Sequence, residues 1–471
     1  MNGTFNGLVN VKRLDIHLND IGQIGSGAFA NLMCLEYLNL DSNSIQTLKN
    51  VQFGLKLLEL SLRFNKLSDL SEIYSQGLNS LIISNNRIQT VNFIVHLSNL
   101  EYLDLSQNGL IKIEKNSFSH VDKLRYLNLS GNKLDLDGEF LGYSQTCLES
   151  LDLSFNDIKY IESANLTFQY LSSLKALNMS NNQIKSLDSN ALESLSQLSD
   201  LNLAWNNIGL IKRDYFLNLR KLRMLKIGFN LLESIDILNN NLEYLDLEQN
   251  KLDKIGEHDF EFNLKLKFLN LNSNPIQKID PRAIFRLTFL KTLKLANTSL
   301  NEIFLTKSLK ELDLSYLNVS ITNIEHLNLI EWINLANTRI RNISFDRFIS
   351  NSTRYVDLSF NFLNTNNFEK LNILSISTET LILRQTNLQQ IEHITFENLI
   401  NLKYLDLSFN NLTYVGSVSF AYNKNLEHLD LSSNKLYEFD VVLNKLKYLN
   451  LENNRIVSIN DQLFDYFSMG R

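Results

Sequence analysis

An eleven-residue pattern, LxxLxLxxNxL, recurs along the whole chain and constrains its fold more than any other feature. Successive copies are evenly spaced: of the 19 intervals nine equal 24, and the extremes are 19 and 26. A register kept from end to end indicates a repeat protein, which grows in length without needing one giant core. The first position of the pattern falls 20 times, at Val11, Leu35, Leu57, Leu78, Leu100, Leu124, Leu148, Leu174, Leu198, Leu222, Leu242, Leu266, Leu290, Leu309, Ile330, Thr353, Thr378, Leu402, Leu426 and Leu446.

The pattern predicts one short strand followed by a turn in each repeat. The LxL segment alternates inward and outward residues with period two, and strands stacked at about 4.8 Å per unit form a long parallel sheet. The Asn falls where the chain leaves the strand, and we expect its amide to satisfy backbone groups in a buried bend. The predicted ladder comprises Asn19, Asn43, Asn65, Asn86, Asn108, Asn132, Asn156, Asn182, Asn206, Asn230, Asn250, Asn274, Asn361, Asn410, Asn434 and Asn454.

Phenylalanine recurs at the back of the unit, usually three residues before a leucine. We expect these rings to be buried on the convex side. They are Phe29, Phe118, Phe216, Phe260, Phe285, Phe396 and Phe420.

The full form of the unit, FxxLxxLxxLxLxxNxL, resembles the "typical" class of the leucine-rich-repeat family, which includes the ectodomains of Toll-like receptors and chaoptin-like and Slit-like proteins. The resemblance implies an α/β leucine-rich-repeat solenoid, a horseshoe with a continuous parallel sheet on its concave face, and an extracellular location. We expect a single domain over 1–471, with regular repeats at 11–289 and 402–471 and irregular repeats at 290–401.

Charge and composition bear on partners. The formal net charge is −6 and no long single-sign run is present, so nucleic acid, which needs a concentrated basic surface, is not expected as a partner. A basic stretch around Lys267, Lys291 and Lys310 is interleaved with acidic residues, which leaves a polyanion open but unsupported. No stretch approaches the length of about 18 apolar residues that a spanning helix needs, so we expect no membrane insertion by this segment.

The two cysteines, Cys34 and Cys147, cannot form a disulfide framework. They stand five repeats apart, about 24 Å at the strand spacing, which is beyond the reach of a disulfide. The chain opens within a unit and lacks the cysteine-rich caps usual in such ectodomains. We therefore expect a fragment, with any signal peptide and anchor outside it. Nine glycosylation sequons are about the number expected by chance among 64 asparagines, so their count is uninformative.

No catalytic signature is present: HExxH, GxSxG, GxxxxGKS/T and CxxC are all missing. Gly22, Gly25 and Gly27 are assigned to a turn, and the seven histidines lack the spacing of metal ligands. The sequence predicts no enzyme, no catalytic residue, no metal and no cofactor.

Aromatic residues occupy two outward rows. The row just before the second strand leucine holds Tyr37, Tyr102, Tyr126, Tyr244, Phe268, Trp332, Tyr355, Tyr404 and Tyr448. The row just before the Asn position holds Phe64, Phe155, Trp205, Phe229, Tyr316, Phe360 and Phe409. Exposed Tyr and Trp are enriched in binding hot spots, although strand propensity and lateral packing alone would also place aromatics here.

The Asn ladder lapses between Leu290 and Leu402, where the spacing also varies; Thr298, Leu317, Thr338 and Thr386 stand in its place. Departures from local rules mark candidate functional regions, and neutral drift of tolerant repeats is the competing explanation. We predict a ligand-binding surface here, formed by Trp332, Tyr355, Tyr316 and Phe360.

The favoured functional hypothesis is a receptor-like extracellular recognition or adhesion module. It would bind a protein ligand or partner receptor through its concave face, and homo- or hetero-dimers are compatible with it. The alternative is an intracellular scaffold that docks a cytosolic protein, favoured by the near absence of cysteine and of a signal peptide.

Overall fold

The computed structural model describes residues 4–458 apart from 71–72, 74, 76, 136–140, 142–144, 163–167, 318–328, 339–350, 364–373, 375, 392–393, 417 and 442. The sequons at Asn2, Asn165, Asn318 and Asn342, and His326 and His393, lie outside the described residues. The chain forms two compact units, Met1–Leu245 and Asp246–Arg471. The single-domain expectation and the division into regular and irregular stretches stay predictions.

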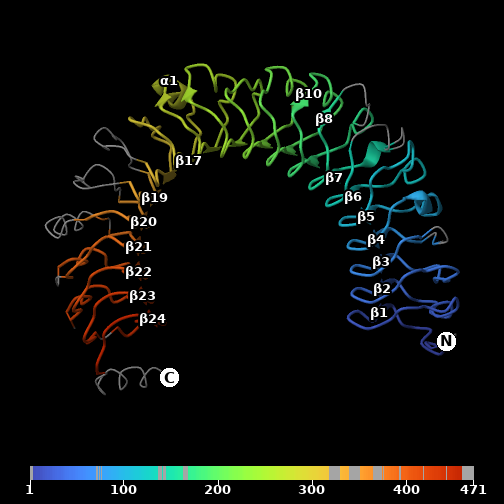
Figure 1. The fold of residues 1–471 in the computed structure, drawn as a ribbon, viewed down its shortest axis with the longest axis horizontal. Helices are drawn as coiled ribbons and strands as arrows, with labels where there is room; N and C mark the ends of the chain where they lie inside the picture. The colour runs from blue at the N-terminus through green and yellow to red at the C-terminus, as the bar shows by residue number, and fades with distance from the viewer. Residues whose placement is uncertain are drawn as a thin grey trace. The chain divides into compact units, whose positions relative to one another are not determined.

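In the first unit, three-residue strands pair in parallel, each with the strand of the next repeat, and Figure 1 shows them side by side along one edge. These strands are β1 (Arg13–Asp15), β2 (Tyr37–Asn39), β3 (Glu59–Ser61), β4 (Ser80–Ile82), β5 (Tyr102–Asp104), β6 (Tyr126–Asn128), β7 (Ser150–Asp152), β9 (Ala176–Asn178), β11 (Asp200–Asn202) and β12 (Met224–Lys226). Strand β13 (Tyr244–Asp246) lies at the boundary, and β8 (Tyr160–Ile161) and β10 (Ser186–Leu187) form a separate parallel pair.

The second unit repeats this arrangement (Figure 1). Its strands are β15 (Phe268–Asn270), β17 (Thr292–Lys294), β18 (Glu311–Asp313), β19 (Trp332–Asn334), β20 (Tyr355–Asp357), β21 (Thr380–Ile382), β22 (Tyr404–Asp406), β23 (His428–Asp430) and β24 (Tyr448–Asn450). A second parallel pair joins β14 (Lys254–Ile255) to β16 (Lys278–Ile279).

The predicted register is confirmed in every repeat. Each of the 20 predicted strands begins two residues after the first position of the pattern. The middle residue of a strand points into the core, as Leu38 and Leu201 do, and the flanking residues face outward. The pattern leucines before and after each strand, such as Leu198 and Leu203, are also buried, so within each of the two units every repeat contributes one layer to the apolar core.

The Asn ladder has the role expected of it, and Asn206 is representative. Its buried Nδ2 donates to the carbonyls of Leu203 and Ala204 in its own turn, at 3.1 and 3.3 Å, and to Met179 of the preceding repeat at 3.0 Å. Its Oδ1 accepts from the Ile184 amide at 2.9 Å. One side chain therefore satisfies groups within its turn and ties two repeats together.

The lapses in this ladder are only partial. The hydroxyl of Thr338 donates to the Leu335 carbonyl at 2.7 Å, as an asparagine would within its own turn, and Thr298 and Thr386 make the equivalent bond. Leu317 is buried at the same position and offers no polar group. Parallel pairing nevertheless continues from β17 to β21, because the strand ladder does not depend on any single Asn.

The buried Phe prediction is confirmed at six positions and wrong at Phe285. Phe29, Phe118, Phe216, Phe260, Phe396 and Phe420 are all buried. Phe285 is 52% exposed, and its neighbour Ile284 is fully buried instead. The reason is register, since Ile284 is the residue that occupies the position equivalent to Phe260 in the next repeat. Phe285 falls one position late, on the outer side of a helical turn.

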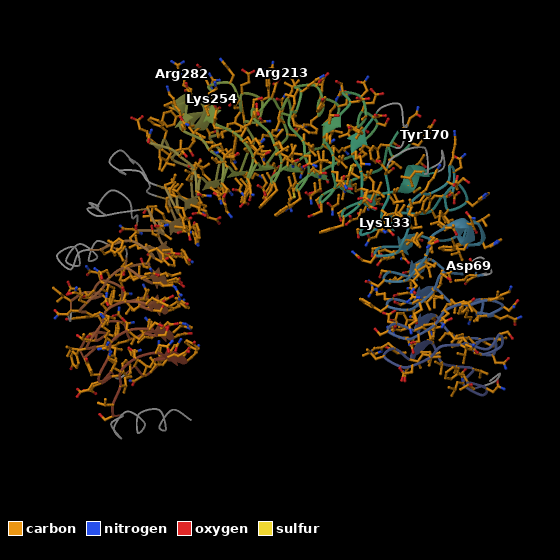
Figure 2. The ribbon with its side chains drawn as sticks, in the orientation of Figure 1. Asp69, Lys133, Tyr170, Arg213, Lys254 and Arg282 are labelled. Carbon is orange, nitrogen blue, oxygen red and sulfur yellow. The ribbon has the colours of Figure 1, made fainter. Side chains whose placement is uncertain are left out.

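Helical structure in the described residues is confined to short turns away from the strands: α1 (Pro281–Phe285), η1 (Asn92–His96) and η2 (Gln145–Cys147). Asp280 caps α1 by accepting from the Arg282 amide, and Pro281 occupies the first turn. Figure 2 shows Arg282 at the outer surface, where its guanidinium pairs with Glu257 at 2.9 Å. In the described part of the chain, no helix has the length and apolar character needed to cross a bilayer.

A second, unforeseen set of buried asparagines lies among the loops. Asn239 donates to the carbonyls of Phe216 and Leu219, and Asn423 donates to those of Phe396 and Leu399. Both replace an apolar residue of the pattern, so the repeats gain extra hydrogen bonds on the side away from the sheet.

The ladder predicts a large difference between two adjacent asparagines. Asn206→Ala should lower the free energy of unfolding by about 3 kcal/mol, because several buried backbone groups lose their partner. Asn207→Ala, at an exposed side chain, should change it by less than about 0.5 kcal/mol. Urea unfolding of both variants measures the difference, and equal losses would contradict the assigned role of the ladder.

Candidate functional site: the open sheet face

In each of the two units, the first and third residues of the three-residue strands point away from the core, and we call the surface that they form the open sheet face of that unit. Along one strand these two side chains stand about 7 Å apart, and equivalent residues on neighbouring strands stand about 4.8 Å apart. The face is therefore a grid with two rows, whose members can be taken from the strand registers.

The third-residue row, the polar ladder, consists mostly of Asp and Asn, whose side chains accept a bond in the turn after the strand; exceptions include Ile82, Lys226, Lys294 and Ile382. Asp152 accepts from the amide and hydroxyl of Ser154 at 2.8 and 2.6 Å, and its other oxygen accepts from Asn178 at 3.1 Å. Asp and Asn serve this turn equally well, since Asn334 accepts from the Ala336 amide as Asp357 accepts from the Ser359 amide. Where this position holds Asp or Asn, the side-chain oxygen makes the turn bond, and that bond does not need the negative charge.

The residues that immediately precede the strands form a charged border. From β18 to β24 their sign alternates at every step: Lys310, Glu331, Arg354, Glu379, Lys403, Glu427 and Lys447. Neighbouring members pair, with Lys310 Nζ 2.5 Å from Glu331 and Lys403 Nζ 2.7 Å from Glu379. Alternation keeps like charges off adjacent strands, and these exposed pairs each contribute at most about 1 kcal/mol.

The predicted residues Trp332 and Tyr355 do meet on this face. They occupy the first position of the adjacent strands β19 and β20, and their rings stack with centroids 5.0 Å apart at 15°. Both rings are half-buried by this lateral packing. Burial, with the charge of nearby Asp357, raises the pKa of the Tyr355 phenol to about 12.

The other two predicted residues, Tyr316 and Phe360, lie outside the grid in the row that precedes the Asn position. They follow β18 and β20, two strands apart, and are 55% and 39% exposed. Trp332 and Tyr355 therefore form one contact pair, while Tyr316 and Phe360 flank it from separate repeats.

That flanking row has an unusual backbone. Tyr316 and Phe360 have φ of 61° and 58°, and Trp205 has 59°. The same left-handed conformation occurs in this row at residues of many types: at asparagines and Gly131, which tolerate it well, and also at serines and glutamines. Tyr316 and Phe360 are exposed in this disfavoured conformation, whereas Trp205 packs laterally against Phe229, with ring centroids 3.8 Å apart.

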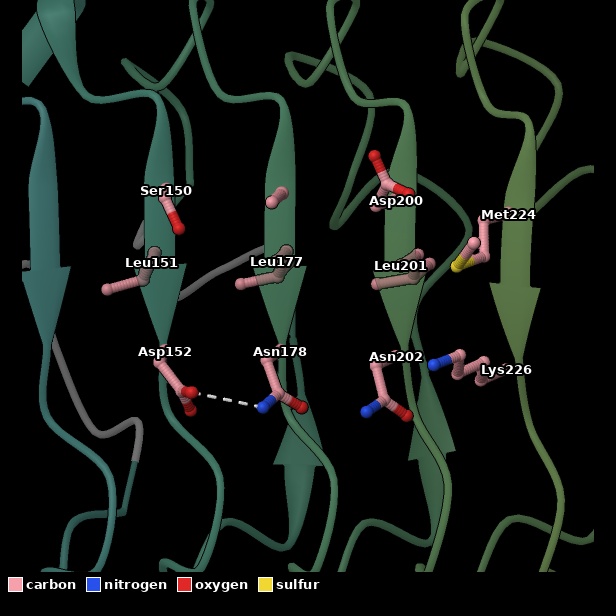
Figure 3. A pocket seen from close by; sticks show the side chains of 11 residues that line it. Ser150, Leu151, Asp152, Leu177, Asn178, Asp200, Leu201, Asn202, Met224 and Lys226 are labelled. Atoms are coloured by element: carbon pink, nitrogen blue, oxygen red, sulfur yellow. Dashed lines mark hydrogen bonds between the residues drawn. The ribbon is translucent and has the colours of Figure 1, made fainter. Parts of the chain in front are cut away.

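A second cluster on the open face lies in the first unit. A shallow depression of about 230 Å³ crosses β7, β9, β11 and β12 (Figure 3). Small residues at Ser150 and Ala176 create it, next to the larger ring of Tyr126 on β6. Its lower border is lined by Asp152, Asn178, Asn202 and Lys226. The sequence carries a signal for it, because small residues interrupt the aromatic row there, but the predicted site was built from aromatics alone.

A third cluster continues the aromatic row at the end of the second unit. His428 is held between Tyr404 and Tyr448, with centroid distances of 4.2 and 4.1 Å and nearly parallel rings. Burial lowers the pKa of the His428 imidazole, and the carboxylates of Asp430 and Asp406 oppose that shift. The sequence pattern places both tyrosines in the row, whereas it gives His428 only as one of seven scattered histidines.

Among the described residues, no group of three or more His, Cys, Asp or Glu side chains could hold a metal ion. Cys34 and Cys147 are both free thiols, the first partly buried and the second exposed.

The sequence comparisons identify the class of protein. A family model described as "Leucine rich repeat" matches residues 2–45, 76–134, 146–208, 240–300 and 376–436. These segments together cover more than half of the chain, which therefore belongs to the leucine-rich-repeat family. Within that family the chain is similar to Toll-like receptor 3, in agreement with the predicted resemblance to Toll-like receptor ectodomains, and also to lumican, which the sequence pattern did not indicate.

Two relatives illustrate this similarity. Toll-like receptor 3 of Boselaphus tragocamelus is 29% identical over 343 residues, covering 66% of this chain and 35% of the receptor. Lumican of Rattus norvegicus is 30% identical over 279 residues, covering 56% of this chain and 74% of lumican. The chain thus spans about a third of the length of the receptor it matches.

Solved structures share the fold. A crystal structure of a TLR13–ssRNA13 complex matches with a TM-score of 0.64 at 22% identity, covering 100% of this chain and 82% of the other. The internalin InlF of Listeria monocytogenes matches with a TM-score of 0.52 at 24% identity, covering 70% and 88%. Because one of these chains was crystallised with single-stranded RNA, the comparisons do not support our expectation that nucleic acid is excluded as a partner.

The polar ladder generates a prediction about Asp357. Burial raises the pKa of this carboxyl, bonds from Ser359 oppose the shift, and the like charges of Asp406 and Asp313 add to it. The ionised form is therefore penalised in the folded state, and Asp357→Asn should raise the melting temperature at pH 7 because Asn preserves the bond from the Ser359 amide.

This gain should shrink as the pH falls through the raised pKa, since wild-type Asp357 then becomes neutral in the folded protein. Melting curves between pH 3 and pH 8 test the sign. A stabilisation that is independent of pH would contradict the assigned cause.

Proposed function

We propose that this chain is the recognition part of a receptor-like extracellular protein, that it binds a protein ligand or partner receptor through the open sheet face, and that it performs no reaction. This is the face that the sequence pattern predicts to be concave. The sequence similarity to Toll-like receptor 3 and lumican supports this class of function. A homo- or hetero-dimer would be compatible with it.

The observation that carries the proposal is the Trp332–Tyr355 stack. Two large rings already ordered against each other lose little entropy on binding, and they bring substantial area to a partner. Tyr316 and Phe360 stand exposed beside them in a backbone conformation that disfavours bulky residues. We infer that these four residues form the main contact surface.

The binding test below also distinguishes two alternative functions. An intracellular scaffold would use the same face on a cytosolic protein, and the free thiols of Cys34 and Cys147 are what favours it. Single-stranded RNA is a second possible ligand, since it was crystallised with one protein of this fold.

The experiment is a binding screen followed by matched substitutions. The purified chain is tested against displayed secreted and cell-surface proteins, cytosolic proteins, and a single-stranded RNA oligonucleotide. For the protein that binds, Trp332→Ala with Tyr355→Ala should weaken affinity about 30-fold or more, the hot-spot threshold of about 2 kcal/mol.

The control is Tyr102→Ala with Tyr126→Ala, a pair at the same strand position on β5 and β6 whose rings are tilted by 37°. These substitutions should change affinity less than about threefold, which is within roughly 0.7 kcal/mol. Binding of RNA alone, or loss at Tyr102 and Tyr126 with none at Trp332 and Tyr355, would overturn the proposal.

A further inference from the structure

From β19 to β24, the row of first strand residues is aromatic at every strand except β21. Tyr355 stacks on Trp332 on one side, and Tyr404 stacks on His428 on the other. Between Tyr355 and Tyr404, β21 presents Thr380, a small and partly exposed side chain in register with both rings. Each tyrosine thus has one ring face covered by its outer neighbour and the other turned towards the threonine.

The dimensions of this interruption suit a flat group. Tyr355 and Tyr404 are two strands apart, about 9.6 Å at the usual strand spacing. A planar group stacks at about 3.5–4 Å from a ring, so one flat group fits between the two tyrosines above Thr380. A third ring in place of Thr380 would have made the row continuous from Trp332 to Tyr448.

The charge around the interruption favours a cation. Asp357 and Asp406 occupy the third position of β20 and β22, about 7 Å along the strand from Tyr355 and Tyr404. Both carboxylates act on the pKa of the nearest tyrosine, raising it. Asn334 and Asn450, elsewhere in this row, accept the same bond from the backbone amide two residues later. The turn therefore does not explain why Asp357 and Asp406 carry a negative charge.

The cations already present near this place have other contacts. The Arg384 guanidinium lies 4.0 Å from the ring centroid of Phe409, and its Nη1 donates to Ser408 at 3.2 Å. On the border, Lys403 pairs with Glu379. Arg354 lies near Glu331, where the bond from Lys310 and the charge of Arg354 both lower the pKa of that carboxyl.

The chain itself shows the contact that would fill the interruption. Arg13 and Tyr37 hold the first positions of the paired strands β1 and β2. The Arg13 guanidinium lies over the Tyr37 ring at 4.0 Å from its centroid. A guanidinium one strand away from a tyrosine in this row therefore stacks on the ring, which is the position that Thr380 leaves open beside Tyr404 and Tyr355.

We propose that the surface formed by Tyr355, Thr380, Tyr404, Asp357 and Asp406 binds an arginine side chain of a protein partner, with the guanidinium plane between the two tyrosine rings and its charge facing the two carboxylates. Arginine matches better than lysine, because the guanidinium is planar, stacks on aromatic faces and is less strongly hydrated. The inference rests on the proposal that the open face recognises proteins, and it names the chemistry of the partner.

The test uses a defined probe in place of the unknown partner. A fluorescein-labelled peptide of Gly-Arg-Gly repeats is titrated against the chain, alongside peptides in which each Arg is replaced by Lys or by neutral citrulline. The Arg peptide should bind at least about tenfold more tightly than the citrulline peptide, and more tightly than the Lys peptide. Equal affinity for the Arg and Lys peptides would overturn the assignment to a guanidinium.

Two matched pairs of variants locate the binding. Thr380→Tyr completes the ring row and should weaken binding of the Arg peptide about tenfold or more, whereas Ala176→Tyr, at the same strand position of β9, should leave it within about twofold. Asp357→Asn with Asp406→Asn should weaken binding about tenfold, and Asp104→Asn with Asp152→Asn, which changes the net charge equally, should not. Circular dichroism checks that every variant is folded.

Equal losses in the two Asp pairs would show attraction to overall charge and would overturn the inference, as would full binding by Thr380→Tyr. Failure of the arginine inference can be distinguished from failure of the proposed function. A protein partner that is lost with Trp332→Ala and Tyr355→Ala but kept with Thr380→Tyr leaves the recognition surface intact and removes only the arginine contact.

Discussion

The stability of this protein depends on hydrogen bonds between successive repeats. A three-residue strand and its turn cannot stand alone, because the turn buries backbone groups that only a neighbouring repeat can satisfy. The Asn side chain supplies those bonds: Asn206 reaches the carbonyl of Met179 and accepts from Ile184 in the repeat before it. The leucine core then follows, since repeats held in this register present their buried leucines in continuous columns.

The same stacking creates a difficulty that the chain resolves locally. Equivalent residues of neighbouring repeats stand about 4.8 Å apart, so an identical charge in every repeat would be repelled along the whole sheet. The alternating border of the second unit, with Lys310 against Glu331 and Lys403 against Glu379, avoids this. In the polar row Asp and Asn are interchangeable for the turn, which leaves the placement of charge free to serve recognition.

The recognition that we propose for this face depends on which residues each row contains and on the strands where a row is interrupted by a small residue. A stacked pair such as Trp332–Tyr355 offers an ordered apolar surface. A small residue beside rings, such as Thr380, offers their uncovered faces, and a run of small residues forms the polar depression across Ser150 and Ala176. One scaffold thus carries chemically different surfaces, because outward residues are not constrained by the core.

The sequence by itself determined the repeat register, the positions of the 20 three-residue strands, and the Asn ladder, because these follow from a periodic pattern that only one stacking satisfies; it did not predict the two-residue strands β8, β10, β14 and β16. It also determined that Trp332 and Tyr355 face outward from adjacent strands. Only the tertiary structure decided how outward side chains interact: Trp332 and Tyr355 stack at 15°, while Tyr102 and Tyr126, equivalent in pattern, are tilted by 37°. The choice of Ile284 over Phe285 for the core, the left-handed backbone under Tyr316 and Phe360, and the enclosure of His428 between two tyrosines were likewise settled in three dimensions. Periodicity fixes which way a residue points, whereas ring orientation and burial depend on neighbours that lie a full repeat away in the chain.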